Sequence, residues 1–449
     1  MASGAKYPKI VVTPPGPKTR ELIREDEAYL PRSMVRCYPL AVESGSGCII
    51  KDLDGNEFID FNAGLGVLGV GHCHPRVVSA IGEQTKKLLH YSFTDFYYRP
   101  IVDLGRELCK ITPGDFSKKV FYCNSGAEAV EAAMKMTKWH TRNSLFLAYT
   151  GAFHGRTLGA VSLTASKLVQ RRHFFPLVPG VTHVPYPYCY RCPFHLSYPE
   201  CDIWCVHFID EEVLSKYVPS ENVAAMFVEP IQGEGGYVVP PDDYFPRLHK
   251  ILDKHNIILV DDEIQSGLGR TGKWFAMEHF NVMPEAVCIA KALGSGLPIG
   301  ALVSKEEFMD WEGGSHASTF GGNPVACMAG LAVINVIKEE RLMENATKQG
   351  AHLLNRLKEM QRKYPIIGDV RGKGLMVGAE IIKDPETKQP GSDLAQEIMM
   401  KCYKRGLAII TAGKSTMRFL PPLVITRELL DAALDVLEGV IKEVASSAK

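Results

Sequence analysis

Lys291 stands directly after an apolar run at residues 286–290 and before a glycine-rich stretch at residues 292–298. An amine at the end of a buried strand loses hydration, which lowers its pKa and leaves more of it neutral and nucleophilic near neutral pH. These are the properties of a lysine that forms a Schiff base with a carbonyl compound. A lysine in this position often just reaches solvent, so Lys291 needs supporting residues before it indicates chemistry.

Two further apolar runs also end in acidic residues. Residues 224–228 are followed by Glu229, and residues 257–260 by an aspartate pair that includes Asp262. In an open α/β sheet, ligands bind beyond the carboxyl ends of the strands, so we expect Glu229, Asp262 and Lys291 to face one crevice. A buried carboxylate is costly unless a cation or a strong donor faces it. A protonated ring nitrogen would supply that partner for Asp262.

The segment at residues 124–128 follows another predicted strand and begins an amphipathic helix. Free amides at such a helix start, together with the hydroxyl of Ser125 and the small Gly126, form an anion site suited to a phosphate. Ser125 and Glu128 also have the spacing of a capping box, which would explain them without any ligand. Both interpretations stay open from the sequence.

Phe153 follows the next predicted strand and offers an aromatic face to a planar cofactor, although a phenylalanine in the core is the commoner explanation. Together, a lysine nucleophile, a buried acid, a phosphate cradle and an aromatic plate describe a pyridoxal 5'-phosphate site. The lysine captures the cofactor aldehyde, the acid keeps the pyridine nitrogen protonated, and the amides hold the phosphate. The freed lysine then moves the proton at the substrate carbon.

Six blocks of the sequence, in the same order, resemble the class III, or ω-type, aminotransferases of the fold type I pyridoxal phosphate enzymes. The blocks are residues 124–129, 153–157, 229–236, 262–272, 291–294 and 318–324. The resemblance implies an α/β fold with a mostly parallel sheet covered by helices in a large domain, plus a smaller α+β domain. It also implies pyridoxal 5'-phosphate as the cofactor.

The resemblance further implies roles for individual residues. Lys291 would form the Schiff base, Asp262 would face the pyridine nitrogen, and Gln265 would donate to the ring hydroxyl. Phe153 would stack on the ring. The phosphate would be bound by residues at the helix start and by one residue of a neighbouring subunit, namely Ser125, Gly126, Ala127 and Thr319. The last assignment makes the active unit a homodimer or a higher homo-oligomer.

Two residues are implied to bind substrate. Arg418 matches the position that binds a substrate's α-carboxylate, an acceptor that a guanidinium grips with two parallel donors. Glu229 matches a carboxylate that, in some relatives, pairs with this arginine when the incoming amine carries no α-carboxylate. The pair would then work as a switch, joined for an ω-amine and separated for an α-amino or 2-oxo acid.

The leading prediction is therefore an aminotransferase that moves the amino group of an ω-amino acid, such as 4-aminobutyrate or ornithine, to 2-oxoglutarate. The alternative is an amino-acid racemase on the same scaffold, because the proline-rich opening at residues 7–17 is similar to a subgroup, frequent in archaea, that includes racemases. A racemase returns the proton to the same substrate carbon from the opposite face, whereas an aminotransferase delivers it to the cofactor. A non-catalytic cofactor-binding module would lack Lys291 or its partners, and none is missing.

Short apolar runs alternate with longer amphipathic stretches along the chain. This alternation favours a parallel sheet covered by helices, and these are the elements that must position the site residues. We predict an N-terminal arm and part of a small domain at residues 1–70, a large cofactor-binding domain at 71–330, and the rest of the small domain at 331–449. The arm extends to about Ile23 and is followed by a hairpin with a turn at residues 54–56. The clearest strands are predicted at residues 119–123, 144–148, 224–228, 257–260 and 286–290.

Composition excludes several other classes. The chain has 51 basic and 51 acidic side chains, so no overall field attracts nucleic acid or an anionic membrane. No segment approaches the roughly 20 apolar residues of a membrane span, and the start lacks the apolar core of a signal peptide. We therefore expect a cytoplasmic protein whose partners are a small amino acid and a 2-oxo acid, with no metal in the catalytic site.

Four of the twelve cysteines, Cys189, Cys192, Cys201 and Cys205, are close together in one aromatic and proline-rich segment. Their paired spacing is compatible with a zinc site, with disulfides or with structural thiols. The sequence leaves these three alternatives open. The other eight cysteines are scattered and read as small buried apolar groups.

Overall fold

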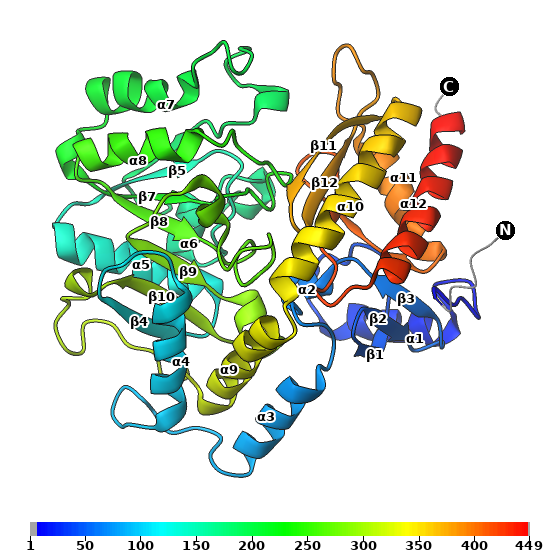
Figure 1. The fold of residues 1–449 in the computed structure, drawn as a ribbon, viewed down its shortest axis with the longest axis horizontal. Helices are drawn as coiled ribbons and strands as arrows, with labels where there is room; N and C mark the ends of the chain where they lie inside the picture. The colour runs from blue at the N-terminus through cyan, green and yellow to red at the C-terminus, as the bar shows by residue number, and fades with distance from the viewer. Residues whose placement is uncertain (1–6, 448–449) are drawn as a thin grey trace. The chain divides into compact units, whose positions relative to one another are not determined.

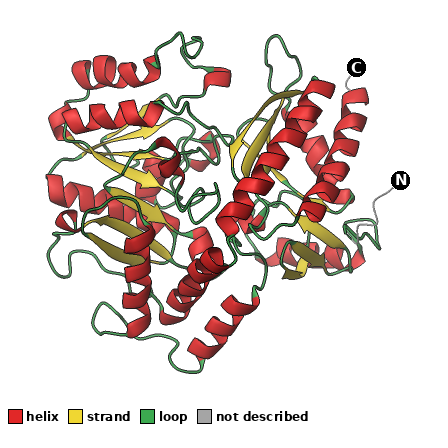
Figure 2. Ribbon diagram, in the orientation of Figure 1, coloured by secondary structure: helices red, strands yellow, loops and turns green. Residues whose placement is uncertain are grey.

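The computed structural model describes residues 7–447, which form two compact units (Figures 1 and 2). The large unit runs from Arg76 to Met343, and the small unit combines the described residues up to Pro75 with those from Glu344 onward. The boundary expected after residue 330 falls inside helix α9 (Pro324–Glu339). The large unit ends after this helix instead, because the buried face of α9 packs against α4 (Arg99–Ile111).

The large unit is built on a seven-stranded sheet. In spatial order its strands are β4 (Lys118–Cys123), β10 (Gly300–Lys305), β9 (Ala286–Ile289), β8 (Ile258–Asp262), β7 (Val223–Val228), β5 (Leu145–Tyr149) and β6 (Val181–Val184). The strands from β9 to β6 are parallel, and β10 runs antiparallel to both of its neighbours. This confirms the predicted mostly parallel sheet. All five predicted strands are present, with ends that differ by one or two residues.

Both faces of this sheet are covered. Along β5, Phe146 and Ala148 pack into the core on the side of α5 (Gly126–Thr141), whereas Leu147 and Tyr149 pack into the core on the side of α8 (Tyr244–Lys254). Strands buried on both faces have continuous apolar runs, which is why they were visible in the sequence. Figure 1 shows α7 (Trp204–Phe208) beside α8, outside the sheet.

The remaining helical segments of the large unit are short or peripheral. They are α3 (Pro75–Thr85), α6 (Leu158–Leu163), η1 (Leu168–Gln170), η2 (Cys189–Arg191), η3 (Ile209–Leu214), η4 (Ser220–Asn222), η5 (Ala276–Phe280), η6 (Lys291–Leu293) and η7 (Glu306–Phe308). Across residues 7–447, no helix has the combination of length and apolar character that crossing a membrane requires.

The small unit contains two four-stranded sheets. The first consists of β1 (Val42–Ser46), β2 (Ile49–Asp52), β3 (Glu57–Asp60) and β13 (Leu407–Ala408), and the second of β11 (Ile367–Lys373), β12 (Met376–Ile381), β15 (Thr416–Phe419) and β14 (Ile410–Ala412). Its helices are α1 (Pro17–Tyr29), α2 (Ala63–Gly66), α10 (Leu342–Lys363), α11 (Ser392–Lys404) and α12 (Arg427–Ser447). The predicted hairpin is the antiparallel pair of β2 and β3.

The N-terminal arm contains a helix, α1, that the sequence did not predict. Asp54, in the hairpin turn between β2 and β3, accepts hydrogen bonds from the amides of Lys18 (2.9 Å) and Thr19 (3.0 Å) in the first turn of α1. These are amides that a helix leaves without an intrahelical acceptor, and a carboxylate there stabilises the helix. The capping carboxylate comes from a distant part of the chain, so no local sequence pattern predicts it.

Candidate active site

The strand register places three ionisable residues at one edge of the large sheet. Val228 of β7 lies opposite Asp261 of β8, and Asp262 lies opposite Cys288 of β9. Since these strands are parallel, Glu229, Asp262 and Lys291 all lie at the edge formed by the carboxyl ends of the strands. That edge is where ligands bind in open α/β sheets.

Asp262 is buried and held by His154. The Nδ1 atom of His154 lies 2.7 Å from one carboxylate oxygen of Asp262, and the amide of Ile264 donates to the other oxygen at 3.1 Å. Burial alone would lower the pKa of His154, but the hydrogen bond to Asp262 and the negative charge of that residue raise it. This contact fixes the orientation of the Asp262 carboxyl group at the sheet edge.

Glu229 is buried at the same edge. Its carboxylate accepts hydrogen bonds from the amide of Phe153 (2.8 Å) and from the amide of Gly233 (2.9 Å). Burial is the main cause that raises its pKa to about 7; the charge of His154 opposes this rise and that of Asp262 adds to it. A carboxyl with this pKa changes readily between its neutral and charged forms when a cation approaches.

Lys291 begins η6 with an unusual backbone conformation. Its φ is +42°, a left-handed value that residues with a side chain seldom adopt. The turn is held by hydrogen bonds from the Leu293 amide to the Ala290 carbonyl (2.9 Å) and from the Gly294 amide to the Lys291 carbonyl (3.2 Å). Strain of this kind persists where the surroundings fix it, and it is common at active sites.

Ser125 is the N-cap of α5, and its hydroxyl accepts a hydrogen bond from the Glu128 amide at 3.2 Å. The capping role considered from the sequence is therefore present. This cap uses the Glu128 amide. The amides of Gly126 and Ala127, also in the first turn, remain as donors for an anion. Gly155 packs against this turn with φ +139°, and a Cβ there would come within 2.7 Å of the Cβ of Ala127. Only glycine allows the Phe153 loop to approach so closely.

The aromatic plate and the predicted ring donor are also in this unit. Phe153 is half-buried, and the guanidinium of Arg156 lies 5.6 Å from the centre of its ring. The side-chain oxygen of Gln265 is buried without a hydrogen-bond partner in the described part of the chain. A buried polar atom of this kind is costly unless a partner, such as a ligand, satisfies it.

These features fit pyridoxal 5'-phosphate. First-turn amides suit its phosphate, the buried carboxyl group of Asp262 suits its pyridine nitrogen, and the unsatisfied side-chain oxygen of Gln265 can accept a hydrogen bond from its ring hydroxyl. When bound, the cofactor supplies an aldehyde that captures amines and a ring that withdraws electrons. The protein would hold it by these groups and would place the Lys291 amine to move a proton.

The remaining two predicted residues are Thr319 and Arg418. Thr319 is exposed, in a loop of the large unit next to Ser318, whose hydroxyl accepts from the side-chain amide of Asn124 at 3.1 Å. Arg418 lies in the small unit, where it is buried on β15. Their roles toward the cofactor and the substrate stay predictions.

Sequence reasoning missed the role of His154. His154 lies in the same sequence block as Phe153, but nothing in the local sequence indicates that it contacts an aspartate 108 positions away. The available signal was its place directly after Phe153, beyond the end of β5. Arg156 was missed for the same reason, because its contact with the ring of Phe153 depends on the shape of the loop.

Comparisons with known proteins agree with this geometry. A family model described as aminotransferase class-III matches residues 30–441. The chain is 40% identical to alanine/serine racemase of Pyrococcus horikoshii, over 98% of this chain and 93% of that protein. It is 38% identical to a probable 4-aminobutyrate aminotransferase of Bacillus subtilis, over 89% and 92% respectively. An ornithine aminotransferase structure from Toxoplasma gondii, described with partial occupancy of PLP, has a TM-score of 0.83 and 30% identity over 96% of each chain.

Proposed function

The chain belongs to the class III aminotransferases, which use pyridoxal 5'-phosphate, and on that premise we propose that it transfers the amino group of an ω-amino acid to 2-oxoglutarate. The observation that carries the proposal is the buried contact between His154 and Asp262. It lies at the carboxyl edge of the sheet, the same edge at which β9 leads into Lys291. It provides an anion for the cofactor ring beside a lysine that can exchange with a substrate amine. 4-Aminobutyrate and ornithine represent the proposed donors.

Glu229 supports an ω-amine as the donor. It is buried and oriented by two backbone amides, and with its pKa of about 7 a cation beside it would stabilise the charged form that burial disfavours. We propose that this cation is Arg418 while an ω-amine reacts. A 2-oxo acid would then take the guanidinium with its α-carboxylate, and Glu229 would become neutral or find another donor.

Arg418→Ala tests this switch. We expect kcat/KM for 2-oxoglutarate to fall by about 10- to 100-fold, since a charged pair of hydrogen bonds is lost, while kcat/KM for 4-aminobutyrate or ornithine falls much less. Steady-state kinetics on both half-reactions measure the difference. Arg405→Ala, which removes a surface arginine of the same unit, is the matched control. Equal losses for the two substrates would contradict the switch.

We also propose that the active unit is at least a homodimer, with Thr319 completing the phosphate site of the other subunit. The exposed position of Thr319 beside a 62%-exposed Phe320 supports this, as do several exposed aromatic residues elsewhere in the large unit, namely Tyr91, Phe96 and Tyr97. Exposed apolar groups of this size are typical of a surface that another protein covers.

Hybrid dimers test the role of Thr319. Thr319→Ala alone should weaken cofactor binding by roughly 10-fold, the effect of one hydrogen bond to a charged group. Refolding or co-expressing it with Lys291→Ala should restore one normal site per hybrid dimer, because one chain supplies Lys291 and the other Thr319. Activity at limiting cofactor measures the restoration. If Thr319 acts within its own chain, the hybrids gain nothing.

A second candidate function is amino-acid racemisation. It is favoured by the alanine/serine racemase relative, which is as similar to this chain as the aminotransferase relative is. The two reactions use the same lysine, acid and cofactor, and they differ in where the lysine returns the proton.

Incubation of the purified protein with single amino acids separates the two functions. The proposed aminotransferase consumes the donor and forms glutamate only when 2-oxoglutarate is present. A D-enantiomer that forms from an L-amino acid without any 2-oxo acid would establish the racemase and overturn the proposal. Chiral chromatography of the products reads both outcomes in one experiment.

A further inference from the structure

Four cysteines of the large unit gather around one small cavity that the proposed reaction does not use. Cys189 and Cys192 are separated by two residues, and Cys201 and Cys205 by three. All four line a single cavity of about 20 Å³, closed otherwise by apolar and aromatic neighbours, namely Pro187, Tyr188, Pro193, Phe194, Leu196, Tyr198 and Trp204. The segment links β6 to α7: Cys189 lies in η2, and Cys205 lies in α7.

The thiols are free and mutually repulsive when ionised. None of the twelve cysteines, all within the described range, forms a disulfide. Several thiols in one apolar cavity need a cation if they are to ionise together.

We propose that Cys189, Cys192, Cys201 and Cys205 form a tetrathiolate site for one zinc ion. A cavity of about 20 Å³ has room for one atom-sized guest, so it suits a single ion and excludes a multi-iron cluster. Four cysteines in two closely spaced pairs are the ligand set of closed structural zinc sites. The other lining residues include no histidine and no carboxylate, so all four coordination positions fall to sulfur.

The sulfur atoms must move inward to bind. In residues 7–447, the only three ligand atoms within 4.8 Å of one another belong to His249, Asp253 and Glu285. Zinc holds each thiolate at about 2.3 Å, so binding must draw together side chains that the structure leaves farther apart. Binding releases the thiol protons to solvent and involves no oxidation, so affinity rises with pH.

The group of His249, Asp253 and Glu285 is a poorer candidate. Its members already satisfy one another, with His249 at 3.3 Å from Glu285 and 3.4 Å from Asp253. Glu285 also accepts from the Leu259 amide at 3.0 Å and lies 3.8 Å from the ammonium of Lys305. A cation is therefore present in that group without any metal.

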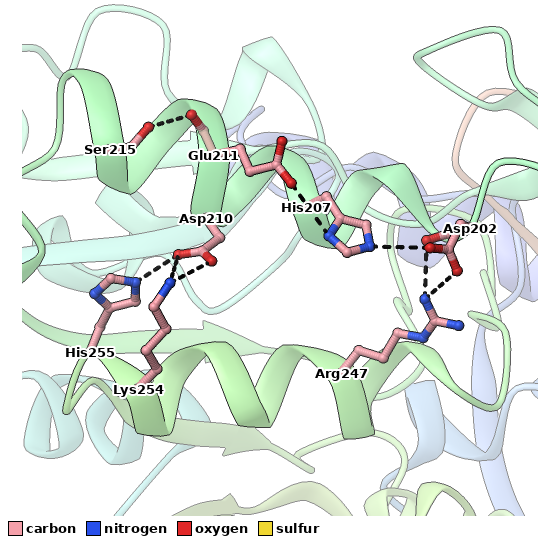
Figure 3. A network of polar contacts seen from close by, with 8 residues as sticks. All are labelled: Asp202, His207, Asp210, Glu211, Ser215, Arg247, Lys254 and His255. Atoms are coloured by element: carbon pink, nitrogen blue, oxygen red, sulfur yellow. Dashed lines mark hydrogen bonds and ion pairs between the residues drawn. The ribbon is translucent and has the colours of Figure 1, made fainter.

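The position of the cysteines indicates what the ion does. Figure 3 shows polar contacts of this region: Asp202 contacts Arg247 of α8 and His207 of α7, and Asp210 contacts Lys254 at the end of α8 and the adjoining His255. Asp202 is next to Cys201 in the sequence. These contacts are mostly exposed, so each stabilises little. A zinc ion would tie the loop that carries Cys189 and Cys192 to α7, which packs against α8.

The segment also adjoins the active site. Tyr186, three residues before Cys189, donates to the carbonyls of Glu229 (3.0 Å) and Pro230 (3.1 Å). The ion would thereby help to hold the backbone that carries Glu229. Its role is structural, and no ligand is left for chemistry.

Metal analysis of the full-length protein, produced with zinc and purified without chelator, tests the site. We expect about one zinc per chain in the wild type and in Cys73→Ser, whose exposed thiol lies in the small unit. Cys192→Ser and Cys201→Ser should each retain roughly 10-fold less. Replacement by Co²⁺ should give the absorption of a tetrahedral tetrathiolate, which is lost in the same two variants.

A measurement on the wild type tests the site even if the cysteine variants fail to fold. Removal of zinc with a chelator at mildly acidic pH, where protons compete with zinc for the thiolates, should lower Tm, and added zinc at neutral pH should restore it. Absence of stoichiometric zinc, with all twelve thiols titratable after denaturation, would overturn the proposal in favour of free thiols. Absence of zinc with only eight titratable thiols would overturn it in favour of two disulfides. Equal zinc in the wild type and in both variants would overturn it too. None of these readouts depends on the proposed reaction.

Discussion

Lys291→Ala should lower kcat by roughly 10⁴-fold or more with every amino donor. The variant loses both the nucleophile that exchanges with the substrate amine and the base that moves the proton at the substrate carbon. Pyridoxal 5'-phosphate should still bind through the phosphate cradle at α5 and through Asp262, although more weakly. Stopped single-turnover assays at saturating cofactor measure the loss without interference from weaker binding.

Lys305→Ala is the matched control for this prediction. Lys305 ends β10, which runs antiparallel to β9, so it lies at the opposite edge of the same sheet from Lys291. Its removal should leave kcat within about threefold, as is usual for a partly exposed side chain far from the chemistry. If Lys291→Ala kept more than about a tenth of the wild-type kcat, Lys291 would have no covalent or proton-transfer role.

Asp262→Asn should lower kcat by about 10²- to 10⁴-fold. The amide has nearly the same shape as the carboxylate but carries no charge, so it cannot stabilise a protonated ring nitrogen. Loss of one partner of a buried ion pair costs about 3–5 kcal/mol, which corresponds to this range when the cost falls on the transition state. The pKa of His154, which the hydrogen bond to Asp262 and the charge of that residue raise, should fall in the same variant.

Asp261→Asn separates this effect from general damage to β8. Asp261 neighbours Asp262 but points to the other side of the strand, and burial together with the charges of Glu263 and Asp262 raises its pKa well above the usual range. An asparagine there replaces a carboxyl that is already neutral, so kcat should change little. Equal losses in the two variants, with equal drops in Tm, would show that Asp262 supports only the fold.

The sequence predicted the parts of the fold that depend on local pattern. β7, β8 and β9 are buried on both faces, so they read as continuous apolar runs, and the ionisable residue that follows each run was visible directly. The position of Glu229, Asp262 and Lys291 at one edge then follows from parallel pairing. The capping spacing of Ser125 and Glu128 was visible for the same local reason.

Contacts between distant residues were beyond the sequence. The hydrogen bond from His154 to Asp262, the cap of α1 by Asp54 and the anchoring of Glu229 by the Phe153 amide join segments that are far apart in the chain. Each depends on loop shapes and on strand register, which no periodicity encodes. The left-handed backbone of Lys291 is another example, because lysine has no preference for that conformation.

The most direct test of the central claim is reduction of the cofactor-loaded protein with borohydride, followed by proteolysis and peptide mass spectrometry. We predict that the pyridoxyl group is found on Lys291, in the peptide that continues through Gly294, and that prior incubation with an amino-acid substrate lowers the labelling. A pyridoxyl group on another lysine, or on none, would contradict the account.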